Sequence, residues 1–355
     1  MSRKRILFLG ETYRADAITW MNGLREFGGF EIVTWELQTS NNGVNRIKRL
    51  IELTKAILTI KKIAKKFNAD MVIAERTTSY GYLAAISGIR PLAIAQQGIT
   101  DLWPTNSPLY VFKKMLQDYA FKKADLIHAW GKVMEDHMKA SDVNMDKVMV
   151  LSKGINLDHF IFNDAHDDKI IDAIVTRSLE PEYRHDLILK AFSIIKKHKI
   201  QFKLTIIGDG IELKKLKSLA KELKIEDEVI FAGRIKNSDI PKFLQKANFY
   251  ISTPITEGVS ASLFEAMACG CFPIVSDLPG NRCWIQQKVN GILVSIKNEF
   301  NLAQELEWAF YNIDFTKKAI TNNRTFVEEN ANYKTNMKKI ANSYHDLIIV
   351  KSTYT

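Results

Sequence analysis

The sequence predicts an α/β protein built from two doubly wound domains, each with a parallel sheet covered by helices. Short apolar runs typical of buried strands alternate along the chain with stretches of helical periodicity. A polar segment at 163–168 interrupts this alternation, which then starts again. The chain has 355 residues, which is more than one hydrophobic core usually holds. We therefore expect two domains and a linker between them.

The first domain is expected over residues 1–165. Apolar runs predict strands over 5–10, 31–35, 71–74, 91–95, 126–130 and 148–151. Apolar residues recurring every three or four positions predict helices over 16–27, 44–67, 82–87 and 110–123. The turn that begins at Gly10 lacks the Gly-x-Gly-x-x-Gly pattern, so a dinucleotide site is not predicted.

The second domain is expected over 166–330, and a separate terminal segment over 331–355. Strands are predicted over 170–176, 202–207, 229–232, 247–253, 271–276 and 292–294. Helices are predicted over 186–198, 213–223, 240–246 and 302–312, with one more ending at Gly270. The amphipathic pattern of 333–350 predicts the last helix.

The composition is that of a globular protein outside the membrane. Apolar residues make up 46% and charged residues 25% of the chain, and no apolar run is long enough to span a bilayer. The apolar run 6–9 is too short for a signal peptide, so a cytoplasmic location is expected. No histidine lies near the three cysteines, which favours small core side chains over a metal site. These are Cys269, Cys271 and Cys283.

Positive charge is concentrated in one window. The net charge is +10, and residues 44–67 hold eight basic residues and one acid, Glu52. Aromatic residues are paired with lysines again over 110–123. These patterns fit ordinary helices with solvated lysines, or a surface that docks on an anionic membrane. Nucleic-acid binding is disfavoured, because the basic window is interleaved with Ile and Leu and not with aromatic residues.

The stretch 254–276 holds the chemistry that stands out. A loop with Pro254 and Gly258 joins a predicted strand to a short helix, and such loops lie at the carboxyl edge of a parallel sheet. The helix N-terminus suits a phosphate, because its amides are unpaired. Glu257 and Glu265 are eight positions apart. Alternatively, Glu257 is an exposed loop acid, and Glu265 completes a capping box with Ser262.

This stretch resembles the Glu-x7-Glu signature of the family 4 retaining glycosyltransferases, which belong to glycosyl transferases group 1. The resemblance includes Glu-Ala-Met-Ala-Cys-Gly-Cys-Phe-Pro-Ile-Val, which begins at Glu265. Residues 153–160 also resemble the segment that closes the first domain of the family. The resemblance implies the GT-B fold, in which two Rossmann-like domains face a cleft and a terminal helix crosses back to the first domain.

The resemblance also implies roles for the second domain in binding a nucleotide-sugar donor. Glu257 would contact the transferred sugar and Glu265 the ribose. Backbone amides would meet sugar and phosphate at Gly258, Val259 and Ser260. The other implied donor-binding residues, of which the two glycines also fit a plain turn, are Gly208, Gly210, Arg234 and Ile235.

Two arginines are the expected cations for the donor diphosphate. Arg177 follows the first strand of the second domain and so points to the cleft, although a surface cation would look the same. In the family an Arg and a Lys clamp the diphosphate. Here Tyr183 stands near the place of the Lys, and Arg184 follows it as the candidate substitute. No two aspartates are two positions apart, so no Asp-x-Asp metal motif exists. Neither a metal nor a cofactor is expected.

Acceptor-binding residues are expected in the first domain. The family often has a His after its fourth strand, where this chain has Gln96 and Gln97. A glutamine donates a hydrogen bond but is not protonated at neutral pH. Asp101 is a second candidate, although it also fits a helix cap. Gly10, after the first strand, is the third.

We therefore expect a retaining, metal-independent transferase that moves a sugar from a nucleotide-sugar donor, with a UDP-sugar favoured. The acceptor would be a hydroxyl of a glycan or lipid-linked glycan, in bacterial surface glycan synthesis. The family reaction is a front-side attack in which the leaving phosphate takes the acceptor proton, so no general base is implied. The alternatives are a sugar-nucleotide epimerase or phosphorylase of similar fold, and, more remotely, a non-catalytic basic module.

Overall fold

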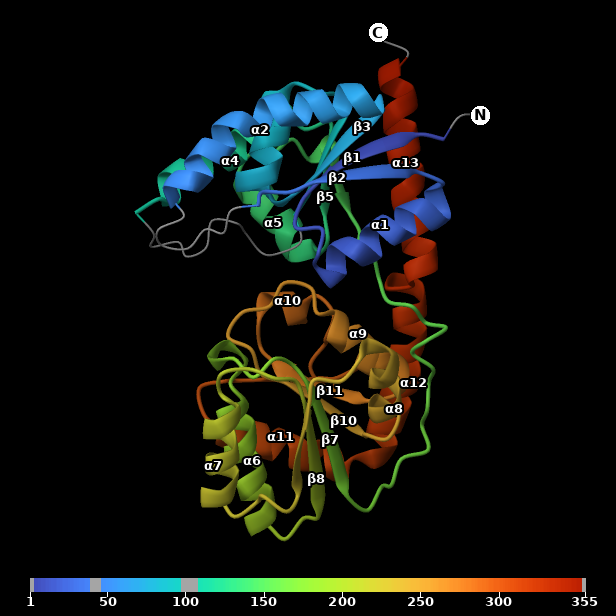
Figure 1. Cartoon of the computed structure of the whole chain (residues 1–355). Coiled ribbons are helices and arrows are strands. Elements are labelled where there is room, and N and C mark those ends of the chain that lie inside the picture. Colours follow the sequence, from blue (N-terminus) through green and yellow to red (C-terminus); the bar gives the residue numbers. More distant parts are fainter. Residues whose placement is uncertain (1–2, 39–45, 97–107, 353–355) are drawn as a thin grey trace. The chain divides into compact units, whose positions relative to one another are not determined.

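The computed structural model describes residues 3–38, 46–96 and 108–352. The chain forms two compact units (Figure 1). The first unit consists of Met1–Lys153 and Lys334–Thr355, and the second of Gly154–Tyr333. Each unit holds a six-stranded sheet in which every neighbouring pair of strands is parallel. The predicted α/β class is confirmed.

The sheet of the first unit has the order β2-β1-β3-β4-β5-β6. Its strands are β1 (Arg5–Leu9), β2 (Glu31–Trp35), β3 (Met71–Glu75), β4 (Leu92–Gln96), β5 (Leu126–Ala129) and β6 (Val148–Val150). Its helices are α1 (Ala15–Gly28), α2 (Arg46–Phe67), α3 (Tyr82–Ser87), α4 (Tyr110–Lys123), α5 (Lys132–Ala140) and α13 (Tyr333–Ser352). The sequence analysis missed α5, which buries Val133, Met134 and Met138 at helical spacing.

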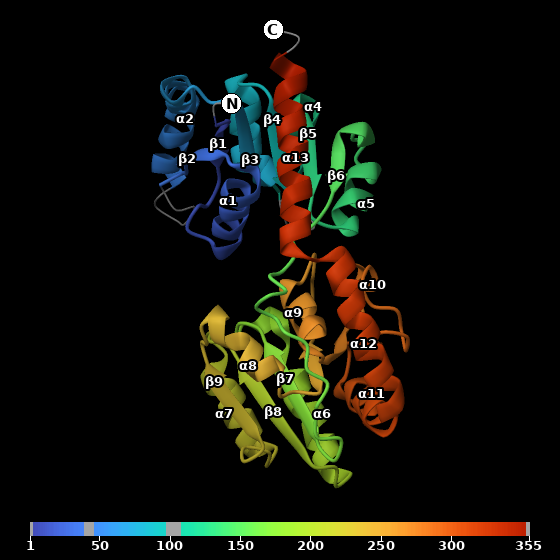
Figure 2. The same cartoon turned by 90° about the vertical axis from the view of Figure 1, so that its right-hand side faces the viewer.

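Helices α1 and α13 run side by side in both views of the first unit (Figures 1 and 2). Trp20 of α1 and Tyr344 of α13 both meet the ring of His128 on β5, at centroid distances of 5.9 and 6.4 Å. His345 stacks on Phe30, just after α1, at 4.2 Å. The terminal helix therefore supplies buried side chains to the core of the first unit.

The sheet of the second unit has the order β12-β11-β10-β7-β8-β9. Its strands are β7 (Ile171–Thr176), β8 (Phe202–Ile207), β9 (Val229–Gly233), β10 (Phe249–Ser252), β11 (Phe272–Ser276) and β12 (Ile292–Val294). Its helices are α6 (His185–Lys197), α7 (Leu213–Glu222), α8 (Ile240–Leu244), α9 (Ala261–Cys269), α10 (Pro279–Arg282), α11 (Glu299–Tyr311) and α12 (Ile313–Asn330). The sequence analysis missed α12.

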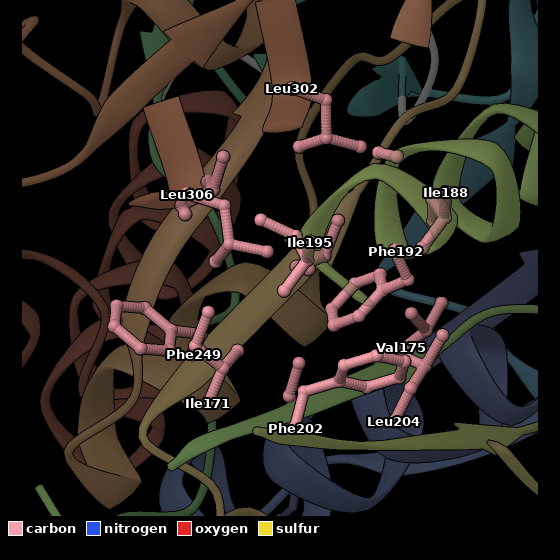
Figure 3. Packing of buried hydrophobic residues seen from close by; sticks show 14 of the residues in the cluster. Ile171, Val175, Ile188, Phe192, Ile195, Phe202, Leu204, Phe249, Leu302 and Leu306 are labelled. Atoms are coloured by element: carbon pink, nitrogen blue, oxygen red, sulfur yellow. The ribbon is translucent and has the colours of Figure 1, made fainter. Parts of the chain in front are cut away.

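Both faces of this second sheet are buried, because alternate residues along a strand belong to different apolar clusters. On β7, Val175 packs with the cluster under α6, α7 and α11, whereas Ile174 packs with the cluster under α8 and α9. Figure 3 shows Phe192 of α6 directed at Phe202 of β8, and their rings are 4.9 Å apart. This double burial explains why residues 272–275 of β11 and 292–294 of β12 form continuous apolar runs in the sequence.

The boundary between the units lies earlier than the sequence analysis placed it. Residues 154–165 were assigned to the first domain, but they pack in the second unit. Phe160 is buried there, and the Asn163 side chain donates to the carbonyl of Gln245 at 2.6 Å. Gly154 has a φ of 75°, and a Cβ at this position would lie 2.3 Å from the carbonyl oxygen of Ala331. The two chain segments that leave the second unit therefore lie in contact.

Among the helices of the described residues, none combines the length and the apolar character needed to cross a bilayer.

Candidate functional site

The carboxyl ends of β7, β8 and β9 surround a pocket of about 630 Å³ in the second unit. Parallel strands end at the same edge of a sheet, so the loops that follow them converge there. Helix α9 closes one side. The pocket is lined by Thr176, Arg177, Ser178, Ile207, Gly208, Asp209, Gly210, Arg234, Ile235, Asn237, Ile240, Ser262 and Glu265. Six predicted donor-site residues are thus in one wall, although they are spread over 89 positions from 177 to 265.

Arg177 is fixed in the pocket wall by contacts on two sides. Its Nη2 donates to Ser260 Oγ at 2.6 Å and also to the Glu257 carboxylate. Its guanidinium lies over the ring of Tyr183, 5.4 Å from the centroid. Burial opposes its charge, but Tyr250 and Glu257 outweigh this and raise the pKa of Arg177. A permanent cation is therefore held at the pocket with little freedom to move.

Glu257, Gly258 and Val259 lie beside the pocket and not in its lining. The Glu257 side chain is 13% exposed, and its Oε1 accepts a hydrogen bond from the amide of Gly258 at 3.2 Å. The loop is also supported by Gly280 of α10. A Cβ at position 280 would lie 2.3 Å from the carbonyl oxygen of Glu257, so only glycine permits this approach.

The N-terminus of α9 is capped by Ser260, not by Ser262. Ser260 Oγ accepts a hydrogen bond from the amide of Leu263 at 3.2 Å. A capping box formed by Ser262 and Glu265 is therefore wrong, because Ser262 is already inside the helix. Both side chains line the pocket instead. The first turn of α9 thus presents a serine and a carboxylate to the space where a ligand would lie.

Gly208 and Gly210 have a structural reason to be glycines. Gly208 has a φ of 146°, and a Cβ there would lie 2.1 Å from the carbonyl oxygen of Arg177. A Cβ at Gly210 would lie 2.4 Å from the carbonyl oxygen of Leu179. These glycines let the loop after β8 pack against the loop after β7. They help to place Arg177, in addition to lining the pocket.

Arg184 does not line the pocket. Its Nε donates to Asp186 at 3.0 Å and its Nη2 to the same carboxylate at 3.3 Å. The residue has a φ of 50°, and its carbonyl accepts a hydrogen bond from Thr253 Oγ1 at 3.3 Å. The structure thus gives its guanidinium a local partner in the first turn of α6. A role for Arg184 at the diphosphate stays a prediction.

His185 is a buried, electrically neutral neighbour of this loop. It is 2% exposed, and its ring nitrogens have no hydrogen-bond partner within the described part of the chain. Burial, the largest effect, lowers the pKa of His185 to about 4. Arg177 acts in the same direction, whereas Asp186 and Glu212 oppose it. The sequence analysis did not single out this residue.

The predicted acceptor-binding residues are only partly described. Gln97 and Asp101 lie outside the described residues. Gly10 is buried in the first unit, where a Cβ would lie 2.6 Å from Glu75 Oε2. The same carboxylate oxygen accepts a hydrogen bond from the amide of Glu11 at 3.0 Å. Gly10 therefore serves the packing of the loop after β1.

Five polar lining residues were missed by the sequence analysis: Thr176, Ser178, Asp209, Asn237 and Ser262. Each lies within three positions of a residue that was predicted. Asp209 stands between Gly208 and Gly210, and its Oδ1 accepts a hydrogen bond from the Gly210 amide at 2.9 Å. A search of every polar side chain after each strand would have found Ser178, Asp209 and Asn237, but not Thr176, which ends β7, or Ser262, which is in a helix.

The pocket combines a fixed cation, a helix N-terminus and several hydroxyl and carboxylate groups. The cation and the amides suit a phosphate, and the carboxylates suit sugar hydroxyls. Together with its size, this set of groups fits a phosphorylated sugar or nucleotide.

Two protein families match the chain in turn. Residues 17–129 match the family described as "Glycosyl transferase 4-like", and residues 158–326 match "Glycosyl transferases group 1". The first match falls in the first unit and the second in the second unit, where it includes the whole pocket.

Characterised relatives are similar over most of the chain. An N-acetylgalactosamine-N,N'-diacetylbacillosaminyl-diphospho-undecaprenol 4-alpha-N-acetylgalactosaminyltransferase from Campylobacter jejuni is 26% identical, over 76% of this chain and 75% of that protein. A UDP-Gal:alpha-D-GlcNAc-diphosphoundecaprenol alpha-1,3-galactosyltransferase from Escherichia coli is 22% identical, over 70% of this chain and 68% of that protein.

Solved structures share the fold. Anabaena HepE in complex with UDP has a TM-score of 0.79 at 15% identity, covering 98% of this chain and 100% of that one. Sucrose-phosphate synthase from Thermosynechococcus elongatus has a TM-score of 0.80 at 15% identity, with the same coverage. The predicted GT-B fold, with two doubly wound domains, is confirmed.

Proposed function

We propose, from the premise that this chain belongs to the group 1 glycosyltransferases, that it is a retaining, metal-independent enzyme using a nucleotide-sugar donor. A UDP-sugar is the favoured donor. The acceptor is a hydroxyl of a glycan or of a lipid-linked glycan that contributes to a bacterial surface polysaccharide. Glycosyltransferase activity itself follows from the family and its relatives.

The arrangement of Arg177 carries this proposal. Departure of a nucleoside diphosphate develops negative charge, which must be stabilised by preorganised cations or dipoles. Arg177 supplies the cation, and the first turn of α9 supplies amides. Both are already fixed, because Ser260 caps the helix and accepts a hydrogen bond from Arg177 at the same time. Since no Asp-x-Asp exists in the chain, these groups take over the role that a metal has in other sugar transferases.

Glu257 is proposed to act on the sugar and Glu265 on the ribose of the donor. Glu257 forms an ion pair with Arg177, which lines the pocket. This ion pair supports a position of Glu257 next to the leaving phosphate. Glu265 is in the lining of the pocket, on the first turns of α9. The amides of Gly258 and Val259 lie on the loop between these two acids and are proposed to meet the sugar.

A lipid-linked acceptor is supported by the relatives. Two of them are named for acceptors carried on undecaprenyl diphosphate, and a third, from Streptococcus pneumoniae, is named alpha-monoglucosyldiacylglycerol synthase. That third protein is 34% identical over 30% of this chain and 24% of its own length. Sugar transfer to a lipid carrier takes place at a membrane surface. We therefore include reversible docking at the inner face of the membrane in the proposal.

Helix α4 supports this docking. Val111, Phe112 and Met115 are each more than half exposed, at 69, 59 and 65%. Lys113, Lys114, Lys122 and Lys123 are on the same helix. Exposed apolar side chains combined with lysines are typical of helices that lie on anionic bilayers. Contiguous apolar side chains on a protein surface often mark an interaction site.

Donor turnover by an Arg177→Ala variant tests the proposed function. Release of UDP from UDP-sugars, with and without an acceptor lipid extract, is measured in excess chelator. We expect acceptor-dependent release by the wild type and a loss of about 100-fold or more in kcat for Arg177→Ala, because a preorganised charge is removed. Product anomeric configuration, read by NMR, tests retention.

Arg282→Ala is the matched control. Arg282 is in the same unit but pairs with Asp277 at the surface, outside the pocket lining. Arg282→Ala should keep wild-type turnover.

Activity that appears only with manganese would contradict the metal-independent mechanism. UDP release that needs no acceptor, together with a rearranged sugar, would favour an epimerase.

A further inference from the structure

The first unit contains its own cavity, of about 400 Å³, at the edge of its sheet. It lies between the ends of β1 and β2 and helix α2. We propose that it binds a neutral hexose or N-acetylhexosamine unit of the acceptor glycan, which rests on the proposed function. The lining residues are Thr12, Thr34, Trp35, Glu36, Gln38, Glu52, Lys55, Ala56 and Thr59.

Glu36 is oriented toward this cavity by the loop after β1. Its Oε2 accepts hydrogen bonds from the amide of Thr12 at 3.1 Å and from the Thr12 hydroxyl at 2.9 Å. Its other oxygen, Oε1, has no hydrogen-bond partner among the residues that the structure describes. A carboxylate held in this way can accept a strong hydrogen bond from a sugar hydroxyl.

The opposite wall of the cavity is formed by α2. Glu52 Oε1 accepts a hydrogen bond from the amide of Gln38 at 2.6 Å, which ties α2 to the chain that follows β2. Lys55 and Thr59 follow at intervals of three or four residues, so their side chains share one side of the helix. The cavity thus offers hydroxyl, amide, carboxylate and ammonium groups from three segments.

Trp35 gives the cavity an apolar surface. Its ring lies edge-on to Tyr80 with the centroids 6.3 Å apart, and the Tyr80 hydroxyl accepts a hydrogen bond from the amide of Leu37 at 3.2 Å. Tyr80 therefore fixes both the indole and the chain beyond it. A sugar presents polar hydroxyls at its rim and C–H groups on its faces, which matches an aromatic ring flanked by polar groups.

The charged groups of the two cavities are arranged differently. The described lining of this cavity contains the carboxylates Glu36 and Glu52 and the ammonium of Lys55, whereas the pocket of the second unit contains Arg177 and Arg234 with Asp209 and Glu265. In that pocket the guanidinium of Arg177 is fixed by the N-cap of a helix, and this combination suits a diphosphate. The carboxylates, hydroxyls and amide of the cavity suit the hydroxyl groups of an uncharged sugar.

Substitution of Thr59 by Trp tests the assignment. Thr59 is an exposed lining residue of α2, so a large side chain there fills the cavity without entering the core. Thr54→Trp is the matched control, because Thr54 is also exposed on α2 and also bonds back to the helix, but it does not line the cavity. Methyl glycosides of glucose, galactose and their N-acetylamino forms serve as probes.

We expect at least one methyl glycoside to bind the wild type in saturation-transfer NMR. Thr59→Trp should abolish this binding, and Glu36→Gln should weaken it about tenfold, since one charged hydrogen bond is lost. Thr54→Trp should bind like the wild type. Binding of UDP should be unchanged in all three variants.

The proposal is overturned if no methyl glycoside binds, or if Thr59→Trp and Thr54→Trp bind it equally. UDP binding separates this failure from that of the proposed function. A protein that binds UDP and transfers sugar, but keeps its acceptor KM in Thr59→Trp, contradicts only the cavity assignment. A protein that neither binds UDP nor releases it from a UDP-sugar contradicts the proposed function.

Discussion

Arg177 and its neighbours illustrate how single side chains are fixed before any substrate binds. Ser260 and Glu257 hold the guanidinium from one side, and Tyr183 covers it. Tyr183 stands near the place where the resemblance puts a lysine, and here its ring supports the guanidinium of Arg177.

His185, next in this loop, predicts a specific dependence of stability on pH. Its pKa is about 4 in the folded protein, because of burial, and about 6.5 when unfolded. Between these values the unfolded chain binds a proton and the folded chain does not, so stability falls as the pH falls from about 6.5 toward 4. Between pH 7.5 and 5 this costs about 2 kcal/mol.

Replacement of His185 by Leu removes the side chain that binds this proton in the unfolded chain. Urea unfolding of the wild type and of His185→Leu at pH 7.5 and pH 5 measures the effect. The variant should lose about 2 kcal/mol less than the wild type between the two pH values. If both proteins lose stability in parallel, His185 is not the buried neutral group that the structure describes.

At the scale of elements, Ser260 at the N-terminus of α9 has a structural role and a proposed role in donor binding. Its Oγ satisfies the amide of Leu263, as an N-cap does, and also accepts from Arg177. An ordinary N-cap supports only its own helix. The two roles can therefore be separated by comparison with another cap.

Ser260→Ala should lower the free energy of unfolding by about 1 kcal/mol and weaken UDP binding about tenfold. Asn298→Ala is the matched control. Asn298 caps α11 through its side chain, which accepts a hydrogen bond from the amide of Asn301 at 3.2 Å, and it does not line the pocket. Asn298→Ala should lower the free energy of unfolding by a similar amount and leave the affinity for UDP unchanged. Thermal unfolding measures the first effect, and calorimetric titration measures the second. Equal UDP affinities in both variants would assign Ser260 a capping role only.

At the scale of the whole molecule, the net charge of +10 and the apolar side chains of α4 predict a common behaviour. The protein should co-sediment with vesicles of anionic lipid at low salt and be released at high salt. Each lysine near the surface contributes about 1 kcal/mol. Phe112→Glu should weaken sedimentation. Phe300→Glu, at an equally exposed position of α11, should not. If the protein stays in the supernatant at low salt, an acceptor in solution is favoured.

The fold could be predicted from the sequence because its strands are buried on both faces. Runs such as Ile6–Leu9 and 71–74 have no polar position to confuse the pattern. Helix α12 was missed because polar residues fill most of 313–330, and its helical form depends on packing against α9. Propensity cannot report a tertiary contact of that kind.

That six of the predicted residues line one pocket follows from the convergence of strand ends in a parallel sheet. Ser262 and Arg184 show the limit of this reasoning. Their partners are set by where α9 and α6 begin, and sequence fixes helix ends only within a few residues. The cavity beside Trp35 was beyond reach, since its walls come from three segments that no sequence pattern connects.

The last helix has a consequence for how the protein is made. Tyr344 and His345 complete the core of the first unit, yet they are synthesised after the entire second unit. On the ribosome, Gly154–Tyr333 is a continuous segment that can fold as soon as it emerges. The first unit can cover Trp20 and His128 with Tyr344 only after residues 333–352 have emerged. We therefore expect the second unit to complete its fold before the first, the reverse of the usual order, in which the amino-terminal domain of a nascent chain folds first.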